Sequence, residues 1–257
     1  MESKVFSLKV ITRLSGSAVL TAALVVAGPI GALAAGSSSP PRTSSIPVSL
    51  TETKTAVRHP TLSRGDSGEA VRTLQKKLDA LGYWTGGKAD GEFGGNTEQA
   101  VLALKKVAGL RRDGVAGPRV WRALARGVRP QARSSQGHVI EIDRKRQVLK
   151  IVNDVTVRYT LNTSTGSGAQ YFSQGSTHIA STPAGHYRVY RQVDGTRHAP
   201  LGVLYRPKYF NGGIAVHGSS SVPAYPASHG CVRVSNRAAD WIWNTHKMPI
   251  GTRVWVY

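Results

Sequence analysis

The chain has 257 residues, enough for one or two folded domains. Its 34 lysines and arginines against 14 acidic residues give a formal charge of +20, which favours anionic partners but is equally compatible with a soluble, solvated surface. A single cysteine excludes an internal disulfide framework and a zinc site built from cysteines alone, so stability must come from apolar burial.

The first 34 residues have the layout of a secretory signal peptide. Lys4, Lys9 and Arg13 precede an apolar run over 18–27, and the small residues at 32–34 suit a cleavage site. The alternative is an uncleaved anchor, although the run is short for a full membrane span. We expect a secreted protein with no membrane span after cleavage and, because it is exported, no nucleic-acid partner.

A tether is predicted over 35–61, which is rich in Ser, Thr and Pro without a period. Apolar residues then recur at helical spacing over 62–126. The first helix is expected to have Asp66 as its N-cap, with Glu69 completing a capping box, and to stop at Gly82.

Two more helices are predicted in the same segment. The second starts at Asn96 and stops at Gly109, and the third has Pro118 at its first position. A DGxxG pattern precedes each of them, at 90–94 and 113–117, where Asp-Gly favours a tight turn. Three short helices in about 65 residues would make a marginal core if they were isolated.

These motifs carry a resemblance to a known family. The matching positions are Gly65 to Gly68, Leu74-Gln75, Leu81-Gly82-Tyr83, Asp90 to Gly94, Gly109-Leu110, Asp113-Gly114 and Trp121. Residues 62–126 resemble the peptidoglycan-binding module often attached to cell-wall enzymes, which implies peptidoglycan as a partner. The sequence departs from that family at Leu104-Lys105, where an aromatic residue and Gln are common.

The hydrophobic period changes to two after a second predicted linker, 127–137. Strands are expected near 138–142, 148–152, 155–161, 186–190, 213–217 and 254–256, with one helix starting at Asn236. The sequence therefore predicts a multidomain α and β protein, in which a small three-helix module precedes a mainly-β domain over 138–257.

The lone cysteine, Cys231, is a candidate nucleophile because histidines lie close to it in the sequence. His217 is preferred as its base, since a predicted strand can aim that imidazole, whereas His229 is only two residues from the thiol. The carbonyl of Gly218 is expected to hold the base in one tautomer, and the amides at Gly230 and Cys231 are candidate oxyanion donors.

Other side chains are expected to complete the site. Ser228 belongs to the turn before the thiol, Arg233 offers a fork suited to carboxylates, and Tyr209 is a candidate for the donor pocket. The remaining histidines show no metal-binding spacing, so we expect no metal and no cofactor. A zinc peptidase and an inert, buried cysteine are the weaker alternatives.

A second resemblance covers 138–257. The motif residues are Ile214 to Gly218, Ser228 to Val234, Thr182 to Gly185 and Pro249 to Thr252. They resemble the catalytic signature of L,D-transpeptidases of the YkuD type. The resemblance implies that Cys231 is the nucleophile and His217 the base, with Ser228, His229, Gly230 and Arg233 in the site wall.

The implied reaction is transfer of a tetrapeptide stem. Cys231 would form a thioester with release of D-alanine, and an amine of a neighbouring stem would resolve it into a 3→3 cross-link. If water resolves the thioester, the enzyme is an L,D-carboxypeptidase; a third reading is a non-catalytic peptidoglycan-binding protein. The expected partner is peptidoglycan, with anionic wall polymers as a further candidate, and the expected location is extracytoplasmic, at the cell wall.

Overall fold

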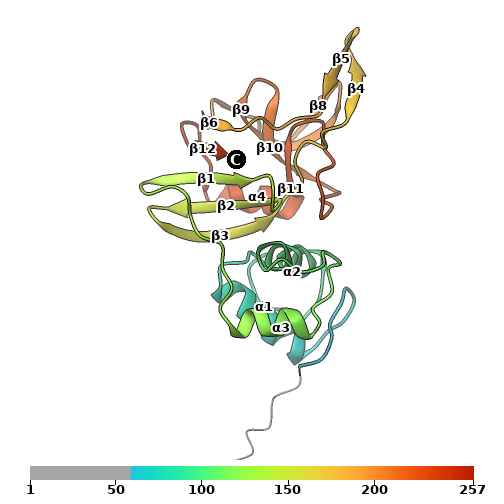
Figure 1. The fold of residues 1–257 in the computed structure, drawn as a ribbon, viewed down its shortest axis with the longest axis vertical. Helices are drawn as coiled ribbons and strands as arrows, with labels where there is room; N and C mark the ends of the chain where they lie inside the picture. The colour runs from blue at the N-terminus through green and yellow to red at the C-terminus, as the bar shows by residue number, and fades with distance from the viewer. Residues whose placement is uncertain (1–58) are drawn as a thin grey trace, which may run out of the picture. The chain divides into compact units, whose positions relative to one another are not determined.

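The computed structural model describes residues 59–257 (Figure 1). The predicted signal peptide and all but the end of the tether lie outside these residues. None of the helices in 59–257 is long and apolar enough to cross a bilayer. A helical module comes first, with α1 (Glu69–Ala80), α2 (Gly95–Val107) and α3 (Pro118–Ala125) around a core that includes Leu74, Leu78 and Val101.

The helix starts differ from the predicted ones. Glycines are the N-caps of both α1 and α2, at Gly68 and Gly94, and neither helix has a side-chain capping bond. Asp66 instead accepts a hydrogen bond from the amide of Ser63 at 2.6 Å, so the predicted capping box is wrong. Asn96 lies inside the first turn of α2. The carboxylate of Asp66 stabilises the turn before the helix and does not reach its amides.

A buried glutamine explains why the first DGxxG turn matters. Gln75 of α1 donates to Asp90 at 2.7 Å and to the hydroxyl of Thr97 at 3.0 Å, and it accepts from the amide of Gly91 at 2.9 Å. Since buried polar groups need partners, this network joins α1, the turn and α2. The turn is therefore part of the core of the module.

Two five-stranded arrangements build the second half of the chain, as expected for a mainly-β domain. The first sheet has the order β3-β2-β1-β12-β6, made of β3 (Thr156–Asn162), β2 (Val148–Asn153), β1 (His138–Asp143), β12 (Arg253–Val256) and β6 (Gly185–Arg188). The second has the order β11-β10-β9-β7, with β8 also on β9, made of β11 (Val232–Ser235), β10 (Ile214–Ser219), β9 (Gly202–Asn211), β7 (Arg191–Gln192) and β8 (Thr196–Ala199). A separate hairpin pairs β4 (Gln170–Ser173) with β5 (Ser176–Ile179).

The core of this domain takes side chains from both sheets and from α4 (Asn236–Asn244). Ile140 and Val254 of the first sheet, Val216 and Val232 of the second, and Ile242 of α4 belong to one buried cluster. Helix α4 starts at Asn236, and its N-cap is Ser235, whose hydroxyl accepts a hydrogen bond from the Ala238 amide at 3.2 Å. Strands β10 and β11 are therefore packed against the first sheet and α4, which fixes their position.

Several strands were not predicted by the alternation of apolar and polar residues. Strand β9 is the longest, yet Pro207 interrupts its sequence and Arg206 has a φ of +48°. Proline removes a ladder donor, and a positive φ is rare away from glycine, so both features argue against a strand. Alternation within short, exposed segments is also weak, as in the β4–β5 hairpin, where every side chain of β5 is exposed.

The segment predicted as a second linker is tied to the first sheet. Glu141 is fully buried on β1, and its Oε1 accepts the amides of Arg133 and Ser134 at 2.8 and 2.7 Å. Lys150 of β2 pairs with Glu141 at 2.5 Å and donates to the carbonyl of Gln131 at 2.7 Å. Because a buried carboxylate needs such partners, this segment is held in one place.

The helical module and the β-rich domain also pack together. Lys106 of α2 is buried, and its ammonium donates to the carbonyls of Gln147 and Thr163, both at 2.9 Å. Trp84, just after α1, belongs to the core cluster of the β-rich domain. The marginal core expected for an isolated module is therefore supplemented by burial against its neighbour.

Candidate active site

Cys231 and His217 come from neighbouring parallel strands. Val216 of β10 is in register with Val232 of β11, and His217 is in register with Arg233. Cys231 comes directly before β11. Because alternate side chains of a strand share a face, the Cys231 thiol, the His217 imidazole and the Arg233 guanidinium belong to the same face of the sheet.

This face opens into a cavity of about 610 Å³. The predicted site residues that line it are Cys231, His217, Gly230, His229, Ser228, Arg233 and Tyr209. Gly218 is the predicted residue that does not line it. Further lining comes from the β4–β5 hairpin and from the β8–β9 hairpin, through residues such as Tyr171, His178, Ile179, Arg197 and Leu201.

The His217 imidazole is buried, and its Nδ1 lies 2.8 Å from the carbonyl oxygen of Gly218. A carbonyl only accepts, so Nδ1 carries the proton and Nε2 is left with its lone pair. Burial lowers the pKa of His217 to about 4, the Gly218 carbonyl raises it in part, and the charge of Arg233 lowers it further. The imidazole is therefore neutral at pH 7 and able to take a proton.

The thiol of Cys231 is half-buried, and it lies 3.7 Å from the carbonyl of Gly213. Burial raises the pKa of Cys231, while a hydrogen bond with the backbone of Ala215 and the charge of Arg233 act in the opposite direction. The free protein thus holds a thiol and a neutral imidazole on the same face of the sheet.

Gly218 is required by packing. A Cβ placed on it would lie 2.8 Å from Oδ1 of Asn236, 2.9 Å from the ring of Tyr205 and 3.0 Å from the methyl of Ala239. Helix α4 therefore packs directly on the backbone that holds the Nδ1 proton of His217. The glycine beside the imidazole allows this close approach, and the carbonyl is held in place as a consequence.

The turn before Cys231 is braced from two sides. Ser228, which is buried, accepts the Gly230 amide at 3.0 Å and donates to the Cys231 carbonyl at 2.5 Å. Thr182, also buried, donates to the Gly230 carbonyl at 2.6 Å and accepts the Gly166 amide at 2.9 Å. Gly230 has a φ of +145°, where an added Cβ would lie 2.8 Å from a carbonyl oxygen of the chain.

This arrangement corrects one expectation. The amide of Gly230 is already bonded to Ser228, so it does not face the cavity as a free oxyanion donor. In the sequence Thr182 stands out only as part of a turn motif, yet in the structure it contacts the same glycine as Ser228 does.

The remaining predicted residues lie on the cavity wall. His229 is exposed and its ring meets the edge of Tyr171 on the β4–β5 hairpin, with centroids 4.8 Å apart. Tyr209 is buried, and the guanidinium of Arg191 lies 4.1 Å from the centroid of its ring. Arg191 and Tyr171 had no signal in the sequence, because both belong to short strands that the pattern does not reveal.

Within residues 59–257, no group of three or more His, Cys, Asp or Glu side chains is placed to hold a metal ion.

Two family models match the chain. Residues 137–256 match the L,D-transpeptidase catalytic domain called YkuD, and residues 67–124 match a peptidoglycan-binding domain. Among solved structures, the L,D-transpeptidase of Xylanimonas cellulosilytica is 52% identical, with a TM-score of 0.74. That match covers 79% of this chain and 98% of that chain.

Curated relatives match over shorter stretches. The N-acetylmuramoyl-L-alanine amidase CwlL of Bacillus licheniformis is 44% identical over 78 residues, which are 30% of this chain and 22% of the relative. The zinc D-Ala-D-Ala carboxypeptidase of Streptomyces albus G is 49% identical over 61 residues, which are 23% of each protein. The chain thus spans about a quarter or less of these two relatives.

The two family models and the match to the Xylanimonas protein lead to one assignment. The chain belongs to the L,D-transpeptidase (YkuD) family and joins the catalytic domain of that family to a peptidoglycan-binding domain.

Proposed function

We propose that the protein is an exported cysteine L,D-transpeptidase that forms 3→3 cross-links in peptidoglycan, with Cys231 as nucleophile and His217 as general base. The observation that carries the proposal is the hydrogen bond from Nδ1 of His217 to the Gly218 carbonyl. It leaves Nε2 unprotonated on the sheet face that also carries the thiol.

The first half of the reaction is acylation. Nε2 of His217 takes the thiol proton while Sγ of Cys231 attacks the carbonyl carbon between the L-centre of the diamino acid and the terminal D-residue. The carbon–sulfur bond forms, the amide C–N bond breaks, and the proton moves from His217 to the departing amine of D-alanine. A thioester remains on Cys231.

The second half regenerates the thiol. An amine of a neighbouring stem attacks the thioester carbonyl and loses a proton to Nε2 of His217. The new amide bond forms, the C–S bond breaks, and the sulfur recovers the proton. Arg233 supports both halves, because its positive charge favours the thiolate and its fork suits a stem carboxylate.

The other predicted residues take supporting roles in this proposal. Ser228, acting with Thr182, orients the turn that carries Cys231, and the amide of Cys231 is the remaining candidate oxyanion donor. His229 and Tyr209 shape the cavity wall, and Gly218 orients His217. The reaction needs no metal or cofactor, because the thiol and imidazole supply the nucleophile and the base.

The segments outside the catalytic domain would place the protein at the cell wall. Residues 1–34 would direct export and 35–61 would tether the protein, while 62–126 would retain it on peptidoglycan and 138–257 would catalyse transfer. The formal charge of +20 supports anionic wall polymers as additional partners outside the membrane.

The deciding experiment is mass analysis of muropeptides after incubation with a tetrapeptide donor. A cross-linked product of two stems with loss of one D-alanine is expected. Tripeptide alone would mean that water resolves the thioester and the enzyme is an L,D-carboxypeptidase. Unchanged tetrapeptide would mean that the protein binds peptidoglycan without catalysing a reaction.

The nucleophile is tested by intact mass after incubation with a carbapenem. The wild type should gain one adduct, and Cys231→Ala should gain none. Ser221→Ala is a matched control, since Ser221 is exposed and does not line the cavity. An adduct that persists in Cys231→Ala would exclude this thiol as the nucleophile.

A further inference from the structure

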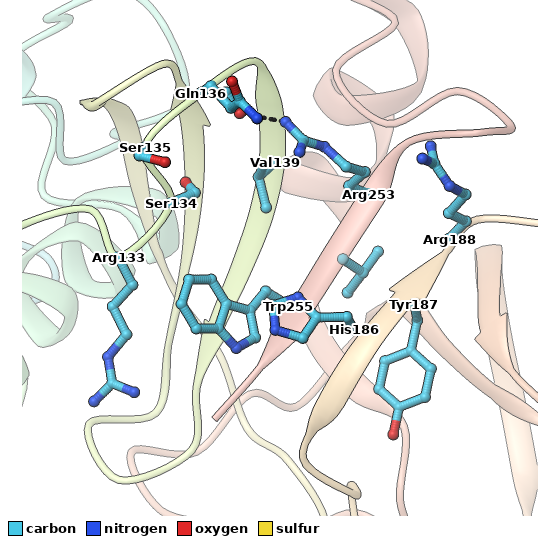
Figure 2. Close-up of a pocket in the computed structure, with 11 residues that line it drawn as sticks. Arg133, Ser134, Ser135, Gln136, Val139, His186, Tyr187, Arg188, Arg253 and Trp255 are labelled. Atoms are coloured by element: carbon cyan, nitrogen blue, oxygen red, sulfur yellow. Dashed lines mark hydrogen bonds between the residues drawn. The ribbon is translucent and has the colours of Figure 1, made fainter.

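A second cavity, of about 520 Å³, lies away from the catalytic one (Figure 2). It is formed by the segment 133–136 together with strands β1, β12 and β6 of the first sheet. None of its lining residues lines the cavity at Cys231. Its volume falls within the range of about 300–1,000 Å³ that is typical of small-ligand sites.

The lining has an ordered layout that follows from strand register. Arg253 of β12 is directly opposite Arg188 of β6, and Trp255 is directly opposite His186. The rings of Trp255 and His186 stack, with centroids 4.7 Å apart and an interplanar angle of 29°. A row of two guanidinium groups thus lies beside a row of two rings, as Figure 2 shows.

A third arginine reaches the cavity from the other side. Figure 2 shows Arg133 across the Trp255–His186 ring pair from Arg188. Its guanidinium lies 3.8 Å from the centroid of the Tyr257 ring. The backbone of Arg133 is held by the buried carboxylate of Glu141, so this wall of the cavity is anchored to the sheet.

The three arginines carry uncompensated charge. None of Arg133, Arg188 and Arg253 forms an ion pair with another of the described residues 59–257, and no acidic side chain lines the cavity. Like charges directly opposite on paired strands destabilise a sheet, so packing alone does not account for Arg188 opposite Arg253. An anionic ligand would remove that repulsion.

Donors remain available for such a ligand. Arg253 donates one bond to the carbonyl of Gln136, and Arg188 donates one to the carbonyl of Gly251 at 3.0 Å. Each guanidinium has five N–H donors in a planar fork that matches phosphate oxygens. A phosphate offers several oxygens to the forks of Arg188 and Arg253, and it brings one negative charge as a diester and up to two as a monoester.

We propose that this cavity binds a phosphate-bearing sugar, with the phosphate on Arg188 and Arg253 and the sugar ring against Trp255. Two sources share this chemistry: a sugar unit of a phosphate-containing wall polymer, and a soluble sugar phosphate. The choice of a wall polymer rests on the proposed extracytoplasmic location, but the site is independent of the chemistry at Cys231.

The site is tested on the full chain by following the indole N–H resonance of Trp255, assigned with Trp255→Phe, during titration with glucose 1-phosphate. Glucose and inorganic phosphate are titrated at matched ionic strength. A saturable shift is expected with glucose 1-phosphate and a weaker response with each component alone. The absence of a saturable shift would overturn the proposal.

Paired charge variants separate a built site from general attraction. Arg188→Gln combined with Arg253→Gln should weaken binding at least about tenfold, since two charge-assisted contacts are lost. Arg158→Gln combined with Arg237→Gln is the matched control, because both are exposed, lie in the same domain and do not line the cavity. Equal weakening in the two double variants would mean that only net charge matters.

The source is distinguished by retention on sacculi before and after hydrofluoric acid removes phosphate-linked polymers. Weaker retention of the wild type after the treatment, with no such change for Arg188→Gln/Arg253→Gln, identifies the polymer. Saturable binding of glucose 1-phosphate with unchanged retention identifies a soluble ligand. Turnover of a tetrapeptide donor should be the same in both double variants, so loss of this site is distinguishable from failure of the catalytic proposal.

Discussion

Nδ1 of His217 lies 2.8 Å from the carbonyl oxygen of Gly218, which is the next residue of the same strand. The carbonyl accepts the Nδ1 proton, and burial keeps the ring neutral. The base of the proposed reaction is therefore prepared in the free enzyme, before any substrate arrives.

The pH dependence of donor turnover follows from this contact. Because burial lowers the pKa of His217 to about 4, the base stays unprotonated well below pH 6.5. The acid limb of kcat/KM, which reports the free enzyme, should have an apparent pKa near 4. Steady-state rates between pH 3.5 and 8 provide the measurement, and an acid limb near 6.5 would contradict the burial argument.

The thiol of Cys231 should react slowly with a small alkylating agent in the free enzyme. Burial raises its pKa, so little thiolate is present at pH 7.5 although the residue is only half-buried. The rate of iodoacetamide labelling should be lower than that of free cysteine and should still be rising above pH 9. A rate that levels off below pH 8 would indicate a preformed thiolate.

Thr182 is expected to act as a positioning residue through its hydroxyl. Thr182→Val keeps the shape but removes the bonds to Gly230 and Gly166. Leaving buried backbone groups without partners should cost about 1–3 kcal/mol of stability. We expect kcat to fall at least about tenfold with a smaller change in KM, since the turn before Cys231 is displaced.

Thr182→Ser is the matched variant, because it restores the hydroxyl. It should recover most of the lost kcat, and melting temperatures would show that both variants fold. Equal loss in the two variants would mean that the methyl group and not the hydroxyl matters at this position.

Gly218→Ala should damage both stability and activity. The new methyl would lie within 3.0 Å of atoms of Asn236, Tyr205 and Ala239, and such overpacking costs about 1–3 kcal/mol. Relief of the clash would move the carbonyl that orients His217. Urea unfolding and donor turnover would measure the two effects.

Gly95→Ala is the control for that substitution. A Cβ there meets nothing within 4 Å, and the residue begins α2. This variant should retain wild-type stability within about 0.5 kcal/mol. If Gly218→Ala also retained wild-type stability and turnover, α4 would be able to move away from the added methyl group without cost.

Lys106 should make stability depend on pH above neutrality. Burial lowers the pKa of Lys106 to about 7 from 10.5, so between these values the unfolded chain binds more protons than the folded chain. The free energy of unfolding contributed by this group therefore rises with pH from 7 towards 10.5. Lys106→Met removes the titrating group and should flatten this rise.

Urea unfolding at pH 7 and pH 9.5 is the measurement. Lys76→Met, at an exposed position of α1, should keep the wild-type difference between the two pH values. An unchanged difference in Lys106→Met would mean that the contact between α2 and the β-rich domain does not carry the titration.

The sequence predicted the strands and helices whose side chains alternate between core and solvent. Helices α1 and α3 and the first half of β3 fall in this class, because burial on one face imposes a period. Strands β1 and β2 are buried along nearly their whole length, and their apolar residues predicted them. The distinctive turns also revealed both resemblances, since glycine and threonine there meet geometric requirements that few other residues satisfy. The motif around Cys231 is one of them.

Tertiary structure alone decided how those pieces meet. The register that brings His217 opposite Arg233, the bond from Thr182 to the Gly230 carbonyl, and the burial of Lys106 all join residues distant in the chain. The cavity at Arg188 and Trp255 depends equally on strand pairing. A local pattern cannot specify these contacts, because their free energy exists only once distant strands have paired and excluded water.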